Sequence, residues 1–105
     1  MNNQRRRELK EQVEKLEEIK SELNSLVEQL EEVKNDIESI KDEEEAAYDN
    51  LPESFQEGEK GSLMQDAMDL MDDAIDGVDT IIGELNEGEE CFQDAIDRIH
   101  EAVSC

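Results

Sequence analysis

Residues 5–49 carry apolar side chains at seven-residue intervals and contain neither glycine nor proline. One row consists of Leu9, Leu16, Leu23, Leu30 and Ile37, and a second row of Ile19, Leu26, Val33, Ile40 and Ala47. Such sustained rows are typical of a coiled-coil helix, and the intervening Glu, Lys and Gln residues favour helix as well. We therefore expect one long helix over about residues 5–49, whose narrow apolar seam needs a partner helix along its length.

The second half of the chain repeats the pattern. One row consists of Met64, Met71, Val78, Leu85, Phe92 and Ile99, and the next of Ala67, Ala74, Ile81, Gly88, Ala95 and Ala102. These rows predict a second helix over about residues 62–103. Gly77, Gly83 and Gly88 each weaken a helix by about 1 kcal/mol relative to alanine, which leaves a break near 83–88 open. The unbroken phase of the first row favours a continuous helix.

Residues 50–61 separate the two repeats. Pro52 disfavours helix at Leu51, so the first helix should end there. The segment from Pro52 to Gln56 could form one turn, with Phe55 folded over the helix ends. Ser62 followed by Gln65 resembles a capping box that opens the next helix. The sequence thus predicts a single all-α domain over residues 1–105, a long two-helix antiparallel hairpin of the coiled-coil type.

The second helix is more apolar than one seam requires. A neighbouring column adds Met68, Ile75, Ile82, Ile96 and Val103, and another adds Leu63 and Leu70. We expect this excess to mediate self-association, most simply as an antiparallel dimer that forms a four-helix bundle. The residues expected to form that contact are Leu63, Met68, Leu70, Met71, Ile75 and Ile82. Two alternatives stay open, a monomeric hairpin and an adaptable methionine surface for a different protein.

The chain has 32 acidic and 10 basic residues, for a formal net charge of −22. Such a charge repels phosphate backbones and anionic membranes, so we expect neither nucleic acid nor membrane as a direct partner. It attracts basic protein surfaces instead. No apolar run is long enough to span a bilayer and no signal peptide is evident, so the expected location is the cytoplasm.

Six aspartates follow the second helix at helical spacing: Asp66, Asp69, Asp72, Asp73, Asp76 and Asp79. They are expected to face away from the apolar rows. One interpretation is that they imitate a row of nucleic-acid phosphates for a basic groove. The match is loose, because carboxylates would recur about every 5 Å whereas DNA carries one charge per about 1.7 Å. The other interpretation is a solvated coat that keeps the protein soluble.

No group of residues suggests catalysis, a cofactor or a metal. His100 has no catalytic partner nearby in sequence, and a thin hairpin offers no deep pocket in which to shift pKa values. The run from Asp72 to Gly83 lacks calcium ligands at the third and twelfth loop positions. Cys91 and Cys105 would lie about 21 Å apart on one helix, too far for a disulfide within the chain. We therefore expect a protein that is not an enzyme.

Residues 43–56, EEEAAYDNLPESFQ, lead into the Gly58–Gly61 segment and the Asp-Ala-apolar-Asp heptads. This arrangement resembles small acidic helical-hairpin proteins of bacteriophages and prophages of Gram-positive bacteria. The resemblance covers roughly residues 35–85 and rests mainly on the Tyr-Asp-Asn-Leu-Pro turn. It implies a phage setting, in which small acidic proteins often inhibit host defence or nucleic-acid enzymes, and it assigns no site residues.

Two functional hypotheses follow. In the first, a phage-encoded inhibitor uses its acidic helix face to bind a basic surface of a host protein that handles nucleic acid or defends the cell. In the second, a structural coiled-coil protein, such as a scaffold or virion component, carries its charge only for solubility. Rising ionic strength should weaken the first kind of binding and spare assembly through apolar columns.

Overall fold

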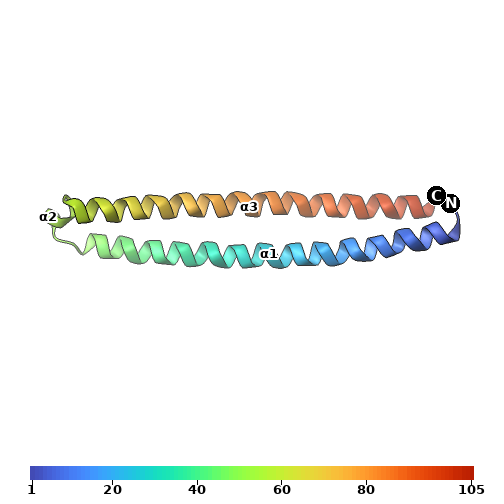
Figure 1. Ribbon diagram of the computed structural model, residues 1–105, viewed down its shortest axis with the longest axis horizontal. Coiled ribbons are helices and arrows are strands. Elements are labelled where there is room, and N and C mark those ends of the chain that lie inside the picture. The colour runs from blue at the N-terminus through green and yellow to red at the C-terminus, as the bar shows by residue number, and fades with distance from the viewer. The chain divides into compact units, whose positions relative to one another are not determined.

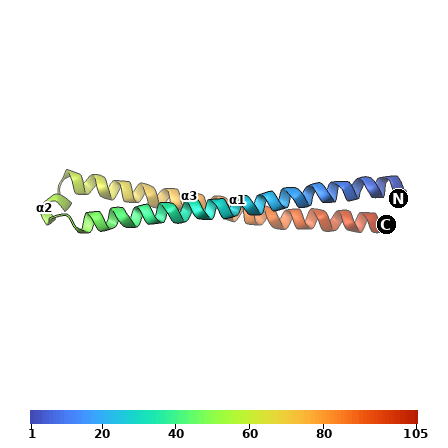
Figure 2. The same ribbon diagram turned by 90° about the horizontal axis from the view of Figure 1, so that it is seen from below.

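The computed structural model describes residues 1–105 and contains three helices and no strand. Helix α1 spans Asn3–Asp49, α2 is one turn over Glu53–Gln56, and α3 spans Glu59–Ser104. The chain divides into unit 1, residues Met1–Gln29 with Ile82–Cys105, and unit 2, residues Leu30–Ile81. In each unit, α1 and α3 lie side by side and run antiparallel (Figures 1 and 2). The protein is therefore all-α and hairpin-like, as its heptads predict.

The helices of each unit meet along positions that alternate in steps of three and four residues. On α1 the partly or fully covered positions are Arg6, Leu9, Val13, Leu16, Lys20, Leu23 and Val27 in unit 1, and Leu30, Lys34, Ile37, Lys41, Glu44 and Tyr48 in unit 2. On α3 they include Met64, Met68, Met71, Ile75 and Val78 in unit 2, and Ile82, Leu85, Glu89, Phe92, Ile96, Ile99 and Val103 in unit 1. The first predicted row of each helix is confirmed as part of this seam.

The second predicted row is wrong on α1, and on α3 only its Ala67, Gly88 and Ala102 are partly covered, because the seam uses the column one residue later. Ile75, Ile82 and Ile96 are only 8%, 9% and 3% exposed, although they were expected to form excess surface. The alternative column of α3 is mostly alanine and glycine, so turning the bulkier isoleucine column inward removes more apolar area from water. This choice leaves apolar area of α1 in contact with water, because Ile19, Leu26, Val33 and Ile40 remain 47–55% exposed.

The glycines of α3 do not interrupt it. The helix is continuous through residues 83–88, and a Cβ built on Gly77, Gly83 or Gly88 would meet no atom within 4 Å. Those three glycines therefore lie where the helix has free space, and none of them marks a turn.

The connector differs in detail from the sequence-based expectation. Because α3 begins at Glu59, Ser62 lies inside the helix and does not cap it. Phe55 is more than half exposed and does not cover the helix ends. Gly61 instead lies against the end of α2, where an added Cβ would overlap the backbone carbonyl of Gln56 and stand 2.7 Å from its Cα. The first turn of α3 thus packs backbone against backbone on α2, which only glycine permits.

Candidate interaction surfaces

Polar contacts between the helices lie along one edge of the seam, which we call the polar edge. In unit 2 the Lys34 Nζ lies 2.8 Å from Asp79 Oδ1, and the Lys41 Nζ lies 2.5 Å from Asp72 Oδ1. In unit 1 the Lys20 Nζ donates a hydrogen bond to Gln93 Oε1 at 2.8 Å. These lysines occupy seam positions, so their aliphatic stems cover the seam while their ammonium groups reach its edge.

Asp72 and Asp79 were expected to face away from the apolar rows, and the structure contradicts this for both. They stand at the polar edge and pair with the lysines of α1. The signal that predicts these pairs is the α1 column that holds Lys20, Lys34 and Lys41 between Val13 and Tyr48. That column looks too polar for a seam until the lysine stems are counted as apolar surface.

The two ion pairs affect the titration of their lysines. The hydrogen bond to Asp79 raises the pKa of Lys34 above its ordinary value of 10.5; desolvation opposes the shift, and the charges of Asp79, Glu38 and Glu31 add to it. The hydrogen bond to Asp72 raises the pKa of Lys41 in the same way, against desolvation and with help from Asp72, Glu45 and Asp42. Both lysines are therefore positively charged when the protein is folded at neutral pH.

A raised folded-state pKa gives these pairs a defined pH dependence. Their stabilisation is fully present below pH 10.5, where both folded and unfolded lysines are protonated, and is lost as the pH rises through the folded-state values. Replacing Lys34 and Lys41 by glutamine should therefore reduce the fall in unfolding free energy between about pH 9 and 12. Urea midpoints measured across that range test this. The control replaces two exposed lysines, Lys10→Gln and Lys15→Gln. If the unfolding free energy of both double variants fell equally steeply with pH, the two ion pairs would not be the source of the pH dependence.

Four aspartates form what we call the outer acidic surface of α3: Asp66, Asp69, Asp73 and Asp76. All four are exposed, and none forms an ion pair. They recur at steps of three, four and three residues along α3 within unit 2, and Asp69 also lines the groove at the polar edge. The six predicted aspartates are thus split into four that form no ion pair and two that pair with lysines of α1.

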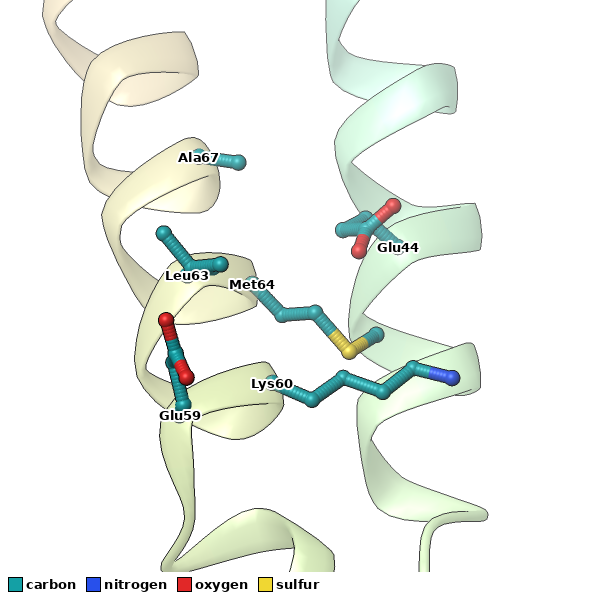
Figure 3. A pocket seen from close by; sticks show the side chains of 6 residues that line it. All are labelled: Glu44, Glu59, Lys60, Leu63, Met64 and Ala67. Atoms are coloured by element: carbon teal, nitrogen blue, oxygen red, sulfur yellow. The ribbon is translucent and has the colours of Figure 1, made fainter.

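The opposite edge of the seam has grooves whose surface is mostly apolar. In unit 1 a groove at this edge is lined by Leu16, Gly88, Cys91, Phe92 and Ala95. In unit 2 a groove is lined by Leu63, Met64 and Ala67 with Glu44, Glu59 and Lys60; Met64 and Lys60 extend from α3 toward α1 (Figure 3). The polar edge, by contrast, has a groove lined by charged and polar groups that include Lys41, Asp69 and Asp72. We call the edge with the apolar grooves, together with the large exposed side chains beside it, the apolar face.

The residues predicted for self-association are distributed over different environments. Leu63 and Leu70 are 62% and 68% exposed, and Leu63 lines the groove of unit 2. Met68 and Met71 are half-buried in the seam, while Ile75 and Ile82 are buried there and present no surface to another chain. Ile19, Leu26, Val33 and Ile40 of α1, which the sequence places in the seam, are exposed in their stead.

The remaining chemical groups form no cluster. No three His, Cys, Asp or Glu side chains are arranged to hold a metal ion, and Cys91 and Cys105 are free thiols. Neither long helix has a stretch apolar enough to cross a bilayer. No protein-family model matches the chain, and searches of curated proteins and of solved structures also find no match.

Proposed function

We propose that the protein acts without catalysis, by binding a basic surface of another protein through the outer acidic surface of α3. The observation that carries this proposal is that Asp66, Asp69, Asp73 and Asp76 project to solvent without a cationic partner in a chain of net charge −22. Their carboxylates suit a groove that ordinarily holds nucleic-acid phosphates.

The setting we propose is a bacteriophage and its bacterial host, on the strength of the resemblance around residues 43–56. The target would be a host protein that handles nucleic acid or defends against the phage. A protein bound in the basic groove of the target would prevent DNA or RNA from binding there, and no chemical reaction would be needed. Duplex DNA should then compete with the protein for that target.

Neutralising the outer acidic surface should abolish this binding. The quadruple variant Asp66→Asn, Asp69→Asn, Asp73→Asn and Asp76→Asn should retain at least about tenfold less target in a pull-down from lysate of a Gram-positive host, since four charge contacts of a few tenths of a kcal/mol or more are lost. The matched control removes the same charge from exposed residues of α1: Glu14→Gln, Glu17→Gln, Glu18→Gln and Glu22→Gln. Equal loss in both variants would show that only net charge matters and would refute the proposed site.

A second candidate is a structural protein that assembles with itself, and the apolar face favours it. Large exposed side chains on both long helices, among them Ile40 and Leu70, are unusual on so acidic a chain. We propose that the protein forms a homodimer, which would place four helices around a common core. Dimerisation and acidic binding use different surfaces, so one protein can do both.

A further inference from the structure

The part of the apolar face that lies in unit 2 is a strip of exposed apolar side chains, which we call the unit 2 strip. Its large members are between 45% and 68% exposed, and Ala67 and Ala74 recur between those of α3. The large members are Val33 and Ile40 on α1 and Leu63, Leu70 and Ile81 on α3. At its end near α2, the strip is hollowed into the groove that Leu63, Met64 and Ala67 line (Figure 3). From Leu63 to Ile81 the strip runs for about 27 Å, given the rise per residue of a helix.

Exposed carboxylates follow both sides of the unit 2 strip. Those on α1 lie three or four residues from Ile40, and those on α3 lie three or four residues from Leu63 or Leu70, so they share a helix face with the strip. They are Asp36 and Glu43 on α1 and Glu59, Asp66 and Asp73 on α3. None of these five carboxylates forms an ion pair. Glu44 also lines the groove at the end of the strip, where Lys60 is the one base.

The bordering carboxylates restrict the charge of any partner that covers the strip. A second copy of unit 2 would bring the same carboxylates against them and has little to neutralise them. The bases of unit 2 are Lys34, Lys41 and Lys60, and the first two are held in ion pairs at the polar edge. Nucleic acid and anionic lipid carry the same sign of charge as the strip's borders and are repelled. A protein segment with an apolar face and basic flanks instead covers the strip and forms ion pairs on both sides of it.

The shape of the strip favours a helix as that segment. The structure has no strand, so an extended peptide would find no sheet edge for its backbone N–H and C=O groups. A helix satisfies its own backbone groups, and its apolar side chains recur at three- and four-residue steps, as those of the strip do. A helix laid along the strip would have one flank beside the carboxylates of α1 and the other beside those of α3. About 18 residues of helix match the length of the strip.

We infer that the unit 2 strip docks an amphipathic helix of a partner protein whose apolar face is bordered by lysine or arginine on both sides. The apolar side chains of that helix cover Ile40 and Leu70, while its two basic flanks meet the bordering carboxylates of α1 and of α3. Asp66 and Asp73 also belong to the outer acidic surface, so this inference rests on the proposed function and names the element of the basic partner that binds. A second copy of the chain is the competing occupant of the strip.

A synthetic peptide tests the docking directly. The probe is a fluorescein-labelled peptide of about 18 residues, with leucines on one helical face and lysines elsewhere. Fluorescence anisotropy should show that the unaltered chain binds it at least about tenfold more tightly than a peptide of the same composition in scrambled order. The scrambled peptide carries the same charge but has no apolar face. Equal affinities for the two peptides would overturn the inference, because charge alone would then account for the binding.

Removing apolar area from the strip should weaken binding of the same peptide. Ile40→Ala with Leu70→Ala should lower its affinity at least about tenfold, because both side chains are covered in the complex. Both are more than half exposed in the free chain, so the helix content should be unchanged in circular dichroism. The control, Ile19→Ala with Leu26→Ala, makes the same changes on the apolar face of unit 1 and should keep the affinity within about twofold. An equal loss in the two variants would mean that the unit 2 strip is not the site.

The carboxylates of α1 separate this inference from the proposed function, since they do not belong to the outer acidic surface. Asp36→Asn with Glu43→Gln should weaken binding of the peptide at least about threefold, because one basic flank loses its partners. The control, Glu31→Gln with Asp42→Asn, removes the same charges from α1 near the lysines of the polar edge and should leave the affinity unchanged. If both variants bound the peptide equally well, no basic flank would lie over α1 and the inference would be wrong.

A pull-down from host lysate shows which of the two proposals has failed. If the Ile40→Ala, Leu70→Ala chain retains a host target that the quadruple aspartate variant loses, the outer acidic surface binds alone. This inference is then overturned and the proposed function stands. If the peptide binds the strip as expected but no host target depends on the four aspartates, the proposed function fails although the strip binds as inferred.

Light scattering tests the competing occupant. The unaltered chain should keep Ile40 and Leu70 free for the peptide, so their replacement by alanine should not change the mass in solution. If the unaltered chain were a dimer that Ile40→Ala with Leu70→Ala converted to the 12.0 kDa monomer, a second copy would cover the strip. That result would overturn the inference in favour of the homodimer.

Discussion

Replacing Ile96 by alanine should lower the free energy of unfolding by about 3 kcal/mol. Ile96 is the most buried side chain in the molecule, at 3% exposed, and lies in the seam of unit 1. The chain buries few side chains this deeply, so removing this one takes away a large part of the apolar area that holds the helices of unit 1 together. Urea denaturation followed by circular dichroism at one fixed protein concentration measures the loss.

The matched control for Ile96→Ala is Phe55→Ala. Phe55 is larger but more than half exposed in α2, so its loss should cost less than about 1 kcal/mol. If the two variants were equally destabilised, burial in the seam would not be the source of stability. The result also tests which column of α3 faces α1. If the alanine and glycine column faced inward, Ala95 would be buried and Ile96 would lie at the edge, so Ile96→Ala would cost little.

Gly61→Ala and Gly83→Ala should change stability in opposite directions, although the chemical change is identical. At Gly61 the new methyl group would overlap the Gln56 backbone, which cannot rotate away as a side chain could, so we expect a loss of about 2 kcal/mol. At Gly83 the methyl group meets nothing within 4 Å, and the better helix propensity of alanine should add about 1 kcal/mol. Thermal and urea unfolding of both variants measure the difference.

The opposite signs make this pair informative about the connector. A gain in stability at both positions would mean that the first turn of α3 does not lie against α2. A loss at both would mean that α3 is distorted near residue 83, which its continuous hydrogen bonding through that segment argues against.

The heptad repeat predicts the fold class and most of the helical residues, because few structures other than packed long helices match a sustained seven-residue apolar period. It does not predict which side of each first row turns inward, since the columns on both sides of Leu16 or Val78 contain apolar residues. That choice depends on both helices together. Burying Ile75, Ile82 and Ile96 removes more area than burying alanine and glycine, and α1 must then bring Lys34 and Lys41 into the seam.

The aspartates of α3 also show that the pattern of one helix does not reveal its contacts with the other helix. Six aspartates look equivalent by spacing, yet Asp72 and Asp79 meet lysines from the other helix and the other four do not. Of the residues predicted for self-association, Leu63 and Leu70 are exposed, whereas Ile75 and Ile82 are buried because their column forms the seam. Capping signals were misleading at Ser62, because the contact of Gly61 with α2 lets the helix begin three residues earlier.

The connector also supplies a built-in optical reporter. Tyr48 is the only tyrosine in a chain without tryptophan. Its hydroxyl accepts a hydrogen bond from Gln65 Nε2 at 2.9 Å, and its backbone carbonyl accepts one from Gln56 Nε2 at 3.0 Å. Its fluorescence therefore responds to opening of the closed end of unit 2 and is blind to unit 1, whereas far-ultraviolet dichroism follows both. Comparing the two signals during unfolding would reveal, without any label, whether the units melt together or in turn.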